Sequence, residues 1–324
     1  MKRKACGLLA IVVFLFPGLL MGQNFPRRNI TMIIPFAAGG PTDALGRIIA
    51  NSMSSTLGKQ VVVENITGGG GTLARLRIAQ AEPDGYSTML AGMGTATSAT
   101  LYRKLPYDPV NAFDTVALVT KVPMLIVGRK DLPAKDLGEL IRYIKSNNEK
   151  VTFGEGGLGS GSQFCGLLLM SALQTKMTMI SYRGSGPAML DLLGGRIDLL
   201  CDQTTTTISH IRGGSIKGYA VTMKNRIVLA PELPPLSDAE PSAQEFSNWY
   251  GLMAPRGTPR AVLDALAASI RAAISDPVVL KRLDEFGAIP VTPDLATPDA
   301  FNTFFRSEVT RWAPIIKAAG VYAD

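Results

Sequence analysis

One pattern of apolar and polar positions occurs twice in this chain: a short apolar run, a stretch of small residues, and then apolar residues at helical spacing. In its first occurrence residues 32–36 form the apolar run, residues 37–42 are small apart from one proline, and the helical period begins at Leu45. This order predicts a buried strand, a bare loop and a helix, with Thr42 or Asp43 as the residue that caps the helix.

The same order returns in the second half of the chain. Residues 151–153 favour a strand, residues 154–162 are rich in glycine and serine, and an apolar helix is expected over 164–173. The sequence therefore predicts an α/β protein with two units, in which the loops that follow the strands face each other across a cleft.

Two further stretches bear on this arrangement. A third loop of small residues is expected over 92–97, directly after a strand over 87–91. The β-rich run 113–127 is long enough to pass from one unit to the other, with an interruption expected at 121–123.

Residues 36–40 are a candidate anion site for two physical reasons. No large side chain after Phe36 shields the backbone N–H groups of this loop, and the first turn of the following helix adds unpaired N–H groups and partial positive charge. The alternative is a tight strand-to-helix turn that needs glycine only for its backbone angles. The glycine-rich stretch 68–71 has a weak dinucleotide-binding spacing, but no acidic residue follows about twenty positions later, which favours a flexible loop near the ligand.

Length, composition and charge exclude some classes of protein. The 324 residues are enough for two domains, and 46% hydrophobic with 18% charged residues is typical of a packed globular protein. Of the formal net charge of +7, three charges lie at Lys2, Arg3 and Lys4, which leaves +4 for the rest of the chain. This excess suits an anionic ligand but is too small and too scattered for a nucleic-acid partner.

The N-terminus has the features of an export signal. Basic residues 2–4 precede an apolar stretch over 7–20, and Gly22 offers a small residue for cleavage, which predicts a signal peptide over 1–22. An uncleaved membrane anchor is the alternative, which the shortness of the stretch and its break at Pro17 and Gly18 disfavour. The mature protein is therefore expected in the periplasm.

Three cysteines are present, and Cys6 would leave with the signal peptide. Cys165 and Cys201 would remain in an oxidising compartment, where they either form a disulfide or stay as two buried thiols. Two cysteines carry no framework pattern, so the sequence leaves both alternatives open.

The chain lacks the residue sets that most catalytic and cofactor chemistry requires. His210 is the only histidine, so a hydrolase triad would depend on it, and it falls in an expected helix. No metal-ligand spacing and no nucleotide-phosphate loop occurs, so no metal and no cofactor is expected. Asp43, Glu155 and Asp202 are candidate carboxylates in the cleft, and a helix cap, a loop residue and a strand-end hydrogen bond explain them equally well.

The order and spacing of eight segments resemble the substrate-binding proteins of tripartite tricarboxylate transporters, the Bug or TctC family. These segments are 33–43 (IIPFAAGGPTD), 61–65 (VVVEN), 83–86 (PDGY), 101–108 (LYRKLPYD), 182–188 (YRGSGPA), 191–195 (DLLGG), 249–255 (WYGLMAP) and 311–312 (RW). Each is weakly specific alone, but together they cover almost the full mature length.

The resemblance implies a type II periplasmic binding fold. Two α/β lobes would be joined by two crossing segments and would close on a ligand in the cleft between them by a hinge motion. Lobe 1 would comprise 23–124 and 245–324, and lobe 2 would comprise 125–244.

The resemblance also implies a ligand class and a set of binding residues. The family binds small carboxylates, including dicarboxylates and tricarboxylates, acidic amino acids and aromatic acids, and holds one carboxylate through backbone amides and ordered waters. Carried over by motif, the binding residues are the amides of Phe36, Ala37, Ala38, Gly39 and Gly40, with Thr42 and Asp43 shaping the loop, Gly157, Gly159, Ser160, Tyr182 and Gly184 in lobe 2 with Asp202 beneath, and Thr95 on the third loop.

Four positions depart from the family pattern. Gln163 replaces the usual histidine, Leu167 a frequent glutamate, Glu155 the start of a serine-rich loop, and Cys201 an aromatic residue. An ionised Glu155 facing the cleft would repel a second carboxylate, which favours a monocarboxylate or a ligand with an amine.

The function expected from this resemblance is capture of a small carboxylate and its delivery to the membrane permease subunits of the transporter, by a protein that acts as a monomer. One alternative is a receptor whose closed form binds a signalling partner. Another is an enzyme on the same fold that uses Asp43 or Asp202.

Overall fold

The computed structural model describes residues 25–323. The predicted signal peptide over 1–22 lies outside these residues. Among the helices of 25–323, none combines the length and the apolar character that crossing a bilayer requires.

Within residues 25–323, ten strands form one continuous sheet whose main path has the order β2-β1-β3-β9-β4-β7-β5-β6, with β8 and β10 paired to β4. The strands are β1 (Ile30–Ile34), β2 (Val61–Asn65), β3 (Ser87–Gly92), β4 (Phe113–Arg129), β5 (Thr152–Glu155), β6 (Thr178–Ser181), β7 (Leu199–Gln203), β8 (Ile216–Val221), β9 (Ser247–Pro255) and β10 (Ile289–Pro290).

Helices cover the sheet on both sides of this path. They are α1 (Pro41–Leu57), α2 (Thr72–Ala79), α3 (Met93–Leu101), α4 (Leu137–Asn147), α5 (Gly161–Leu173), α6 (Ser185–Leu193), α7 (Thr204–Arg212), α8 (Arg260–Ala273), α9 (Pro277–Glu285) and α10 (Pro298–Ala319). Short 3₁₀ turns occur at Gly69–Gly71, Asn148–Lys150 and Leu236–Asp238.

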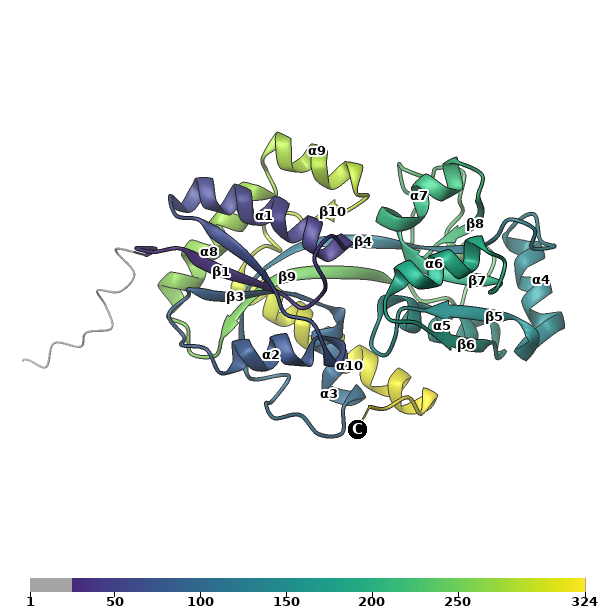
Figure 1. Cartoon of the computed structure of the whole chain (residues 1–324), viewed down its shortest axis with the longest axis horizontal. Coiled ribbons are helices and arrows are strands. Elements are labelled where there is room, and N and C mark those ends of the chain that lie inside the picture. Colours follow the sequence, from purple (N-terminus) through teal and green to yellow (C-terminus); the bar gives the residue numbers. More distant parts are fainter. Residues whose placement is uncertain (1–24, 324) are drawn as a thin grey trace, which may run out of the picture.

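The elements gather into two groups that β4 connects (Figure 1). One group holds β1–β3 with α1–α3 and α8–α10, and the other holds β5–β8 with α4–α7. The first part of β4 pairs with β9, up to Pro123 opposite Ser247, and from Met124 onward β4 pairs with β7 and β8. This is the mixed α/β arrangement with two lobes that the resemblance implies; the boundaries at 124/125 and 244/245 stay predictions.

The expected interruption at 121–123 does not occur, because β4 runs unbroken from Phe113 to Arg129. Pro123 lies opposite Ser247, where the ladder between β4 and β9 ends, so its missing N–H removes no bond from the middle of the sheet. Nearly every side chain of β4 is buried, since helices cover both faces of the strand.

Two helix starts differ from the sequence prediction. The cap of α1 is Gly40, with Pro41 as the first helical residue, so Thr42 and Asp43 lie in the first turn and the prediction that one of them is the cap is wrong. Gly92 is extended and caps α3, which begins at once at Met93. The third loop over 92–97 is therefore replaced by a helix, and Thr95 lies in its first turn.

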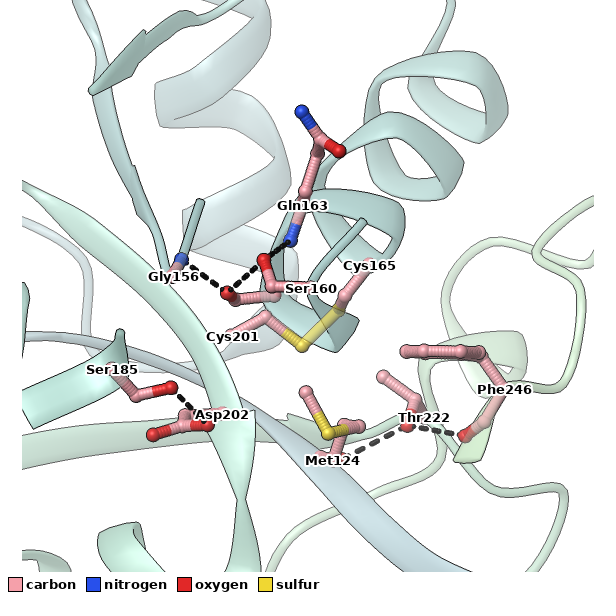
Figure 2. The surroundings of a disulfide bond; sticks show 11 residues. Met124, Gly156, Ser160, Gln163, Cys165, Ser185, Cys201, Asp202, Thr222 and Phe246 are labelled. Carbon is pink, nitrogen blue, oxygen red and sulfur yellow. Dashed lines mark hydrogen bonds between the residues drawn. A yellow bond between two sulfur atoms is a disulfide. The ribbon is translucent and has the colours of Figure 1, made fainter. Parts of the chain in front are cut away.

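The sequence left two alternatives for Cys165 and Cys201, a disulfide or two buried thiols, and the structure has the disulfide. Cys165 in α5 and Cys201 in β7 form a disulfide with a Cα–Cα distance of 6.2 Å (Figure 2). The bond fixes the first turns of α5 against the carboxyl end of β7, which are the two places in lobe 2 where binding residues are expected.

Candidate functional site

The loop 36–40 follows β1 and reaches the surface instead of being covered by side chains. Phe36 is 48% exposed, and the next three residues are exposed as well. Among residues 25–323, no acceptor pairs with the amides of Phe36, Ala37, Ala38 or Gly40. These N–H groups therefore remain available as donors beside the N-terminus of α1.

Asp43 holds this loop from the protein side. Its Oδ2 accepts hydrogen bonds from the Gly39 amide and from Arg47 Nε, each at 2.9 Å, and its Oδ1 accepts one from Asn65 Nδ2 at 2.9 Å. The Arg47 hydrogen bond, with help from Gly39 and Asn65, lowers the pKa of Asp43 to about 2. The carboxylate is thus ionised. It accepts the hydrogen bond of the Gly39 amide, so this amide is not an open donor as its neighbours are.

Gly39 adopts a backbone conformation that other residues avoid. Its φ of 81° lies in the left-handed region, and this turn directs the Gly39 amide towards Asp43. Asn65, at the end of β2, also donates to the carbonyl of Phe36 at 2.9 Å. Asn65 therefore holds the loop at Phe36, and Asp43 holds it at Gly39.

The corresponding loop in lobe 2, residues 156–160, precedes α5 (Figure 2). Ser160 caps the helix by accepting from the Gln163 amide at 3.2 Å, and Ser162 Oγ accepts from the Gly156 amide at 2.6 Å. Gln163, which replaces the histidine usual in the family, accepts from the Gly159 amide through Oε1 at 2.8 Å. The amide of Gly157 has no partner within 25–323, so this loop also presents an open donor.

Asp202, at the end of β7, joins two helix N-termini. Its Oδ1 accepts from Ser185 Oγ of α6 at 3.0 Å and its Oδ2 accepts from Thr206 Oγ1 of α7 at 2.7 Å. The side chain is buried, and burial raises its pKa. Asp202 therefore holds the first turns of α6 and α7 together.

Tyr182 and Gly184 take part in the framework of lobe 2. The amide of Tyr182 donates to the carbonyl of Glu155 at 2.9 Å, and its hydroxyl donates to Asp191 Oδ2 at 2.8 Å. The amide of Gly184 donates to the carbonyl of Gly156 at 3.2 Å. The turn at 182–184 is thus fastened to the loop 156–160.

Tyr250 on β9 connects the two groups of elements. Its hydroxyl donates to Gln203 Oε1 of β7 at 3.2 Å and lies 3.2 Å from Thr42 Oγ1 of α1. Because the tyrosine proton is used on Gln203, Thr42 is the donor in the second bond. Burial raises the pKa of Tyr250, which keeps this hydroxyl protonated. Sequence reasoning missed Tyr250 and Gln203, although Tyr250 belongs to the motif 249–255.

The two groups of elements also approach each other at Gly70 and at Gly159. A β-carbon at Gly70 would lie 3.5 Å from the carbonyl oxygen of Leu158, and one at Gly159 would lie 3.0 Å from Leu101 Cδ2. Gly159, with φ of 77°, fits where a larger residue would not. Thr95 on α3 accepts a hydrogen bond from Arg75 Nε at 3.4 Å, so its hydroxyl contacts a buried guanidinium.

The structure therefore brings some of the predicted residues to the boundary between the two groups of elements. Thr42 reaches Gln203, the neighbour of Asp202, through Tyr250. The loop 156–160 lies against α3 and the turn Gly69–Gly71. Within residues 25–323, no group of three or more histidine, cysteine, aspartate or glutamate side chains is placed to hold a metal ion.

Glu155 is buried at the end of β5, only 5% exposed. Its Oε2 has no hydrogen-bond partner, and burial raises its pKa against the opposing effects of Ser181 and Gln163. Burial therefore opposes ionisation of Glu155, and ionised Glu155 is the form on which the expected repulsion of a second carboxylate depends.

Comparison with known proteins identifies the family. The family model described as "Tripartite tricarboxylate transporter family receptor" (TctC) matches residues 45–321. A UPF0065 protein from the TAR-I ttuE–ttuC′ intergenic region of Agrobacterium vitis is 46% identical over 298 residues, covering 92% of this chain and 86% of that protein.

Solved structures give the same result. The periplasmic binding protein BugD superposes with a TM-score of 0.84 at 41% identity and covers 93% of this chain and 100% of its own. MatC from Rhodopseudomonas palustris, solved with bound malate, superposes with a TM-score of 0.82 at 36% identity and covers 90% of this chain and 100% of its own. This chain therefore belongs to the TctC family of periplasmic solute-binding proteins, which are receptors and not enzymes.

Proposed function

We propose that this protein captures a small carboxylate in the periplasm and delivers it to the membrane permease of a tripartite tricarboxylate transporter. The observation that carries the proposal is the exposed loop 36–40, whose four unpaired amides lie beside the N-terminus of α1. The similarity to MatC, solved with malate, supports a carboxylate as the ligand.

The physical basis is an anion site made of backbone donors. Amides at a helix N-terminus favour negative charge, and hydrogen bonds from N–H groups to a carboxylate are about twice as strong as neutral ones. Asp43 fixes the loop before the ligand arrives, so little conformational entropy is lost on binding.

The proposed binding residues are those predicted from the family motif, with distinct roles. The amides of Phe36, Ala37, Ala38 and Gly40 contact the carboxylate, whereas Asp43 holds Gly39 and shapes the loop. In lobe 2 the open amide of Gly157 contacts the ligand, while Gly159, Ser160, Tyr182 and Gly184 shape the surface around it, with Asp202 as support and Thr95 on α3. The two lobes, 23–124 with 245–324 and 125–244, close on the ligand by bending at the segments that connect them.

Calorimetry on the mature protein tests the binding part of the proposal. Malate, succinate and their uncharged diamides are titrated into the protein, and the acids are expected to bind while the diamides do not. A folded protein that binds no carboxylate of a wide panel would contradict the proposal, as would conversion of a bound acid into another compound.

The transport part needs a second experiment. The permease subunits of a tripartite tricarboxylate transporter are reconstituted in vesicles, and uptake of the labelled ligand is measured with and without the receptor. Uptake is expected only with the receptor present. A receptor that binds its ligand but supports no uptake would favour the signalling alternative.

A further inference from the structure

Glu308 on α10 joins both tryptophans of the chain. Its side chain is buried, and its Oε2 accepts hydrogen bonds from Trp249 Nε1 at 3.1 Å and from Trp312 Nε1 at 3.0 Å. Its Oε1 accepts a longer one from Arg311 Nη1 at 3.4 Å, and Arg311 also donates to the carbonyl of Glu245. Three N–H groups thus satisfy one buried carboxylate, which fixes the orientation of both indole rings.

Trp312 extends this cluster to the other group of elements. α10 belongs to the group of β1–β3, and it reaches towards α5 of the other group (Figure 1). The ring centroid of Trp312 lies 4.8 Å from that of Phe164 on α5 and 5.5 Å from that of Phe246, the residue before β9. All three side chains are at most 2% exposed. Trp312 therefore packs against both the other group and the segment by which the chain returns from it.

Phe164 connects this contact to the binding loop of lobe 2. Its amide donates to the carbonyl of Ser160, the cap residue of α5, at 3.2 Å. The loop 156–160 ends at that cap and carries the open amide of Gly157. Because backbone hydrogen bonds hold the first turn of a helix to its cap, the position of Phe164 determines where this loop ends.

Trp249 shares the Glu308 carboxylate but has different aromatic neighbours. Its ring contacts Phe301, Phe304 and Phe305, which all lie on α10. In the described part of the chain, the aromatic contacts of Trp249 thus stay within one group of elements, whereas those of Trp312 bridge two. This difference allows the two tryptophans to be tested against each other.

We propose that Glu308 and Trp312 are positioning residues for ligand capture, which act through Phe164 on the loop 156–160. Glu308 holds the Trp312 ring, the ring holds Phe164, and Phe164 sets where the open amide of Gly157 meets the ligand. The inference rests on the proposed function, because it requires a ligand at this loop. Coupling between two sites is reciprocal, so a ring that affects ligand affinity must itself respond to the ligand.

The competing role for the cluster is structural support alone. In that case the loss of a contact lowers the free energy of unfolding, and the protein that remains folded binds its ligand as tightly as before. The ligand also leaves the indole rings undisturbed. The two roles therefore differ in the Kd of variants and in the fluorescence change on binding.

Tryptophan fluorescence of the mature protein tests the response to the ligand. The probe is the acid that binds the wild type most tightly in calorimetry, chosen from malate, succinate, adipate, aspartate and benzoate. It is titrated into the wild type, W249F and W312F, and each variant keeps one tryptophan. The emission of the wild type and of W249F is expected to change, because both keep Trp312. The emission of W312F should stay constant.

Calorimetry with the same acid tests the effect on affinity. F164L should raise the Kd by about 2- to 12-fold, the value of one aromatic pair. E308L leaves two buried indole N–H groups without an acceptor and should raise the Kd at least as much. E308Q keeps an acceptor oxygen for the indoles, so its Kd should lie within about threefold of the wild type.

F305L is the matched control for F164L. Phe305 is also buried and packs against Trp249 with a centroid distance of 6.4 Å, within one group of elements. Its loss should lower the free energy of unfolding in urea and leave the Kd unchanged.

Each outcome supports or overturns the inference. If W312F responds to the acid as strongly as W249F, or if F164L binds as tightly as the wild type, the inference is wrong while the proposed function stands. If F305L raises the Kd as much as F164L, a general loss of stability explains the effect, and the inference is again wrong. If none of the five acids binds the wild type, the proposed function fails and the inference fails with it. Should E308L not fold, F164L and the two single-tryptophan variants still decide.

Discussion

Asp43 acts on the binding loop through its position in the first turn of α1, where it accepts three hydrogen bonds within 2.9 Å. Its pKa of about 2 lies below the unfolded value of 3.8. A carboxyl group whose pKa is lowered on folding stabilises the protein above its unfolded pKa, and the contribution is lost as pH falls through the folded pKa. The benefit is thus complete above about pH 5 and disappears towards pH 2.

The variant D43N should lower the free energy of unfolding by about 1–2 kcal/mol at pH 7, after allowance for solvent screening at Arg47. It should also weaken carboxylate binding, because the Gly39 turn loses its acceptor. Urea unfolding between pH 3 and pH 7 checks the first effect and calorimetry the second. D264N is the control, since Arg260 Nε lies 2.9 Å from Asp264 in the same i,i+4 geometry but at the surface. A control that loses as much stability as D43N would contradict this account.

Glu155 should have the opposite dependence on pH. Burial raises its pKa on folding, so the folded state loses stability as pH rises above the usual range of a glutamate. The variant E155Q removes the ionisable group and keeps the shape. Its stability relative to the wild type should therefore increase from pH 4 to pH 8, measured as the difference in urea midpoint. Parallel curves for the two proteins would show that Glu155 ionises without penalty.

At the scale of the element, the strand–loop–helix units could be predicted from the sequence because their periodicity is local. The order of apolar run, small residues and helical period fixed the existence of α1 and α5. The starts of α1 and α3 could not be predicted in this way, because Gly40 and Gly92 begin their helices with backbone angles instead of capping side chains. Contacts between distant segments, such as Tyr250 with Gln203, have no local pattern to reveal them.

The disulfide is the element-scale feature with the clearest energetic consequence. Cys165 and Cys201 are 36 positions apart, so their bond restricts the unfolded chain and should stabilise the protein by about 3–4 kcal/mol. The double variant C165A/C201A should lose about that amount in urea unfolding and should bind carboxylate more weakly, because α5 and β7 are no longer tied. A reducing agent should destabilise the wild type and leave the double variant unchanged. Equal sensitivity of both proteins to the reductant would contradict the prediction.

At the scale of the whole molecule, the closure proposed above draws on contacts that link the two groups of elements through β9. Tyr250 provides one by bridging Thr42 and Gln203, so Y250F leaves two polar groups without their partner. On the proposal that the two groups of elements close on the ligand, this bridge helps to hold them together, so its loss should raise the Kd for a carboxylate by about 5- to 30-fold. Y219F is the matched control: Tyr219 is also a buried tyrosine, and its hydroxyl donates to the Ala134 carbonyl at 2.9 Å within one group, so its loss should cost stability without changing Kd. Calorimetry and urea unfolding on both variants separate the effects, and a Kd unchanged in Y250F would mean that this bridge does not contribute to ligand capture.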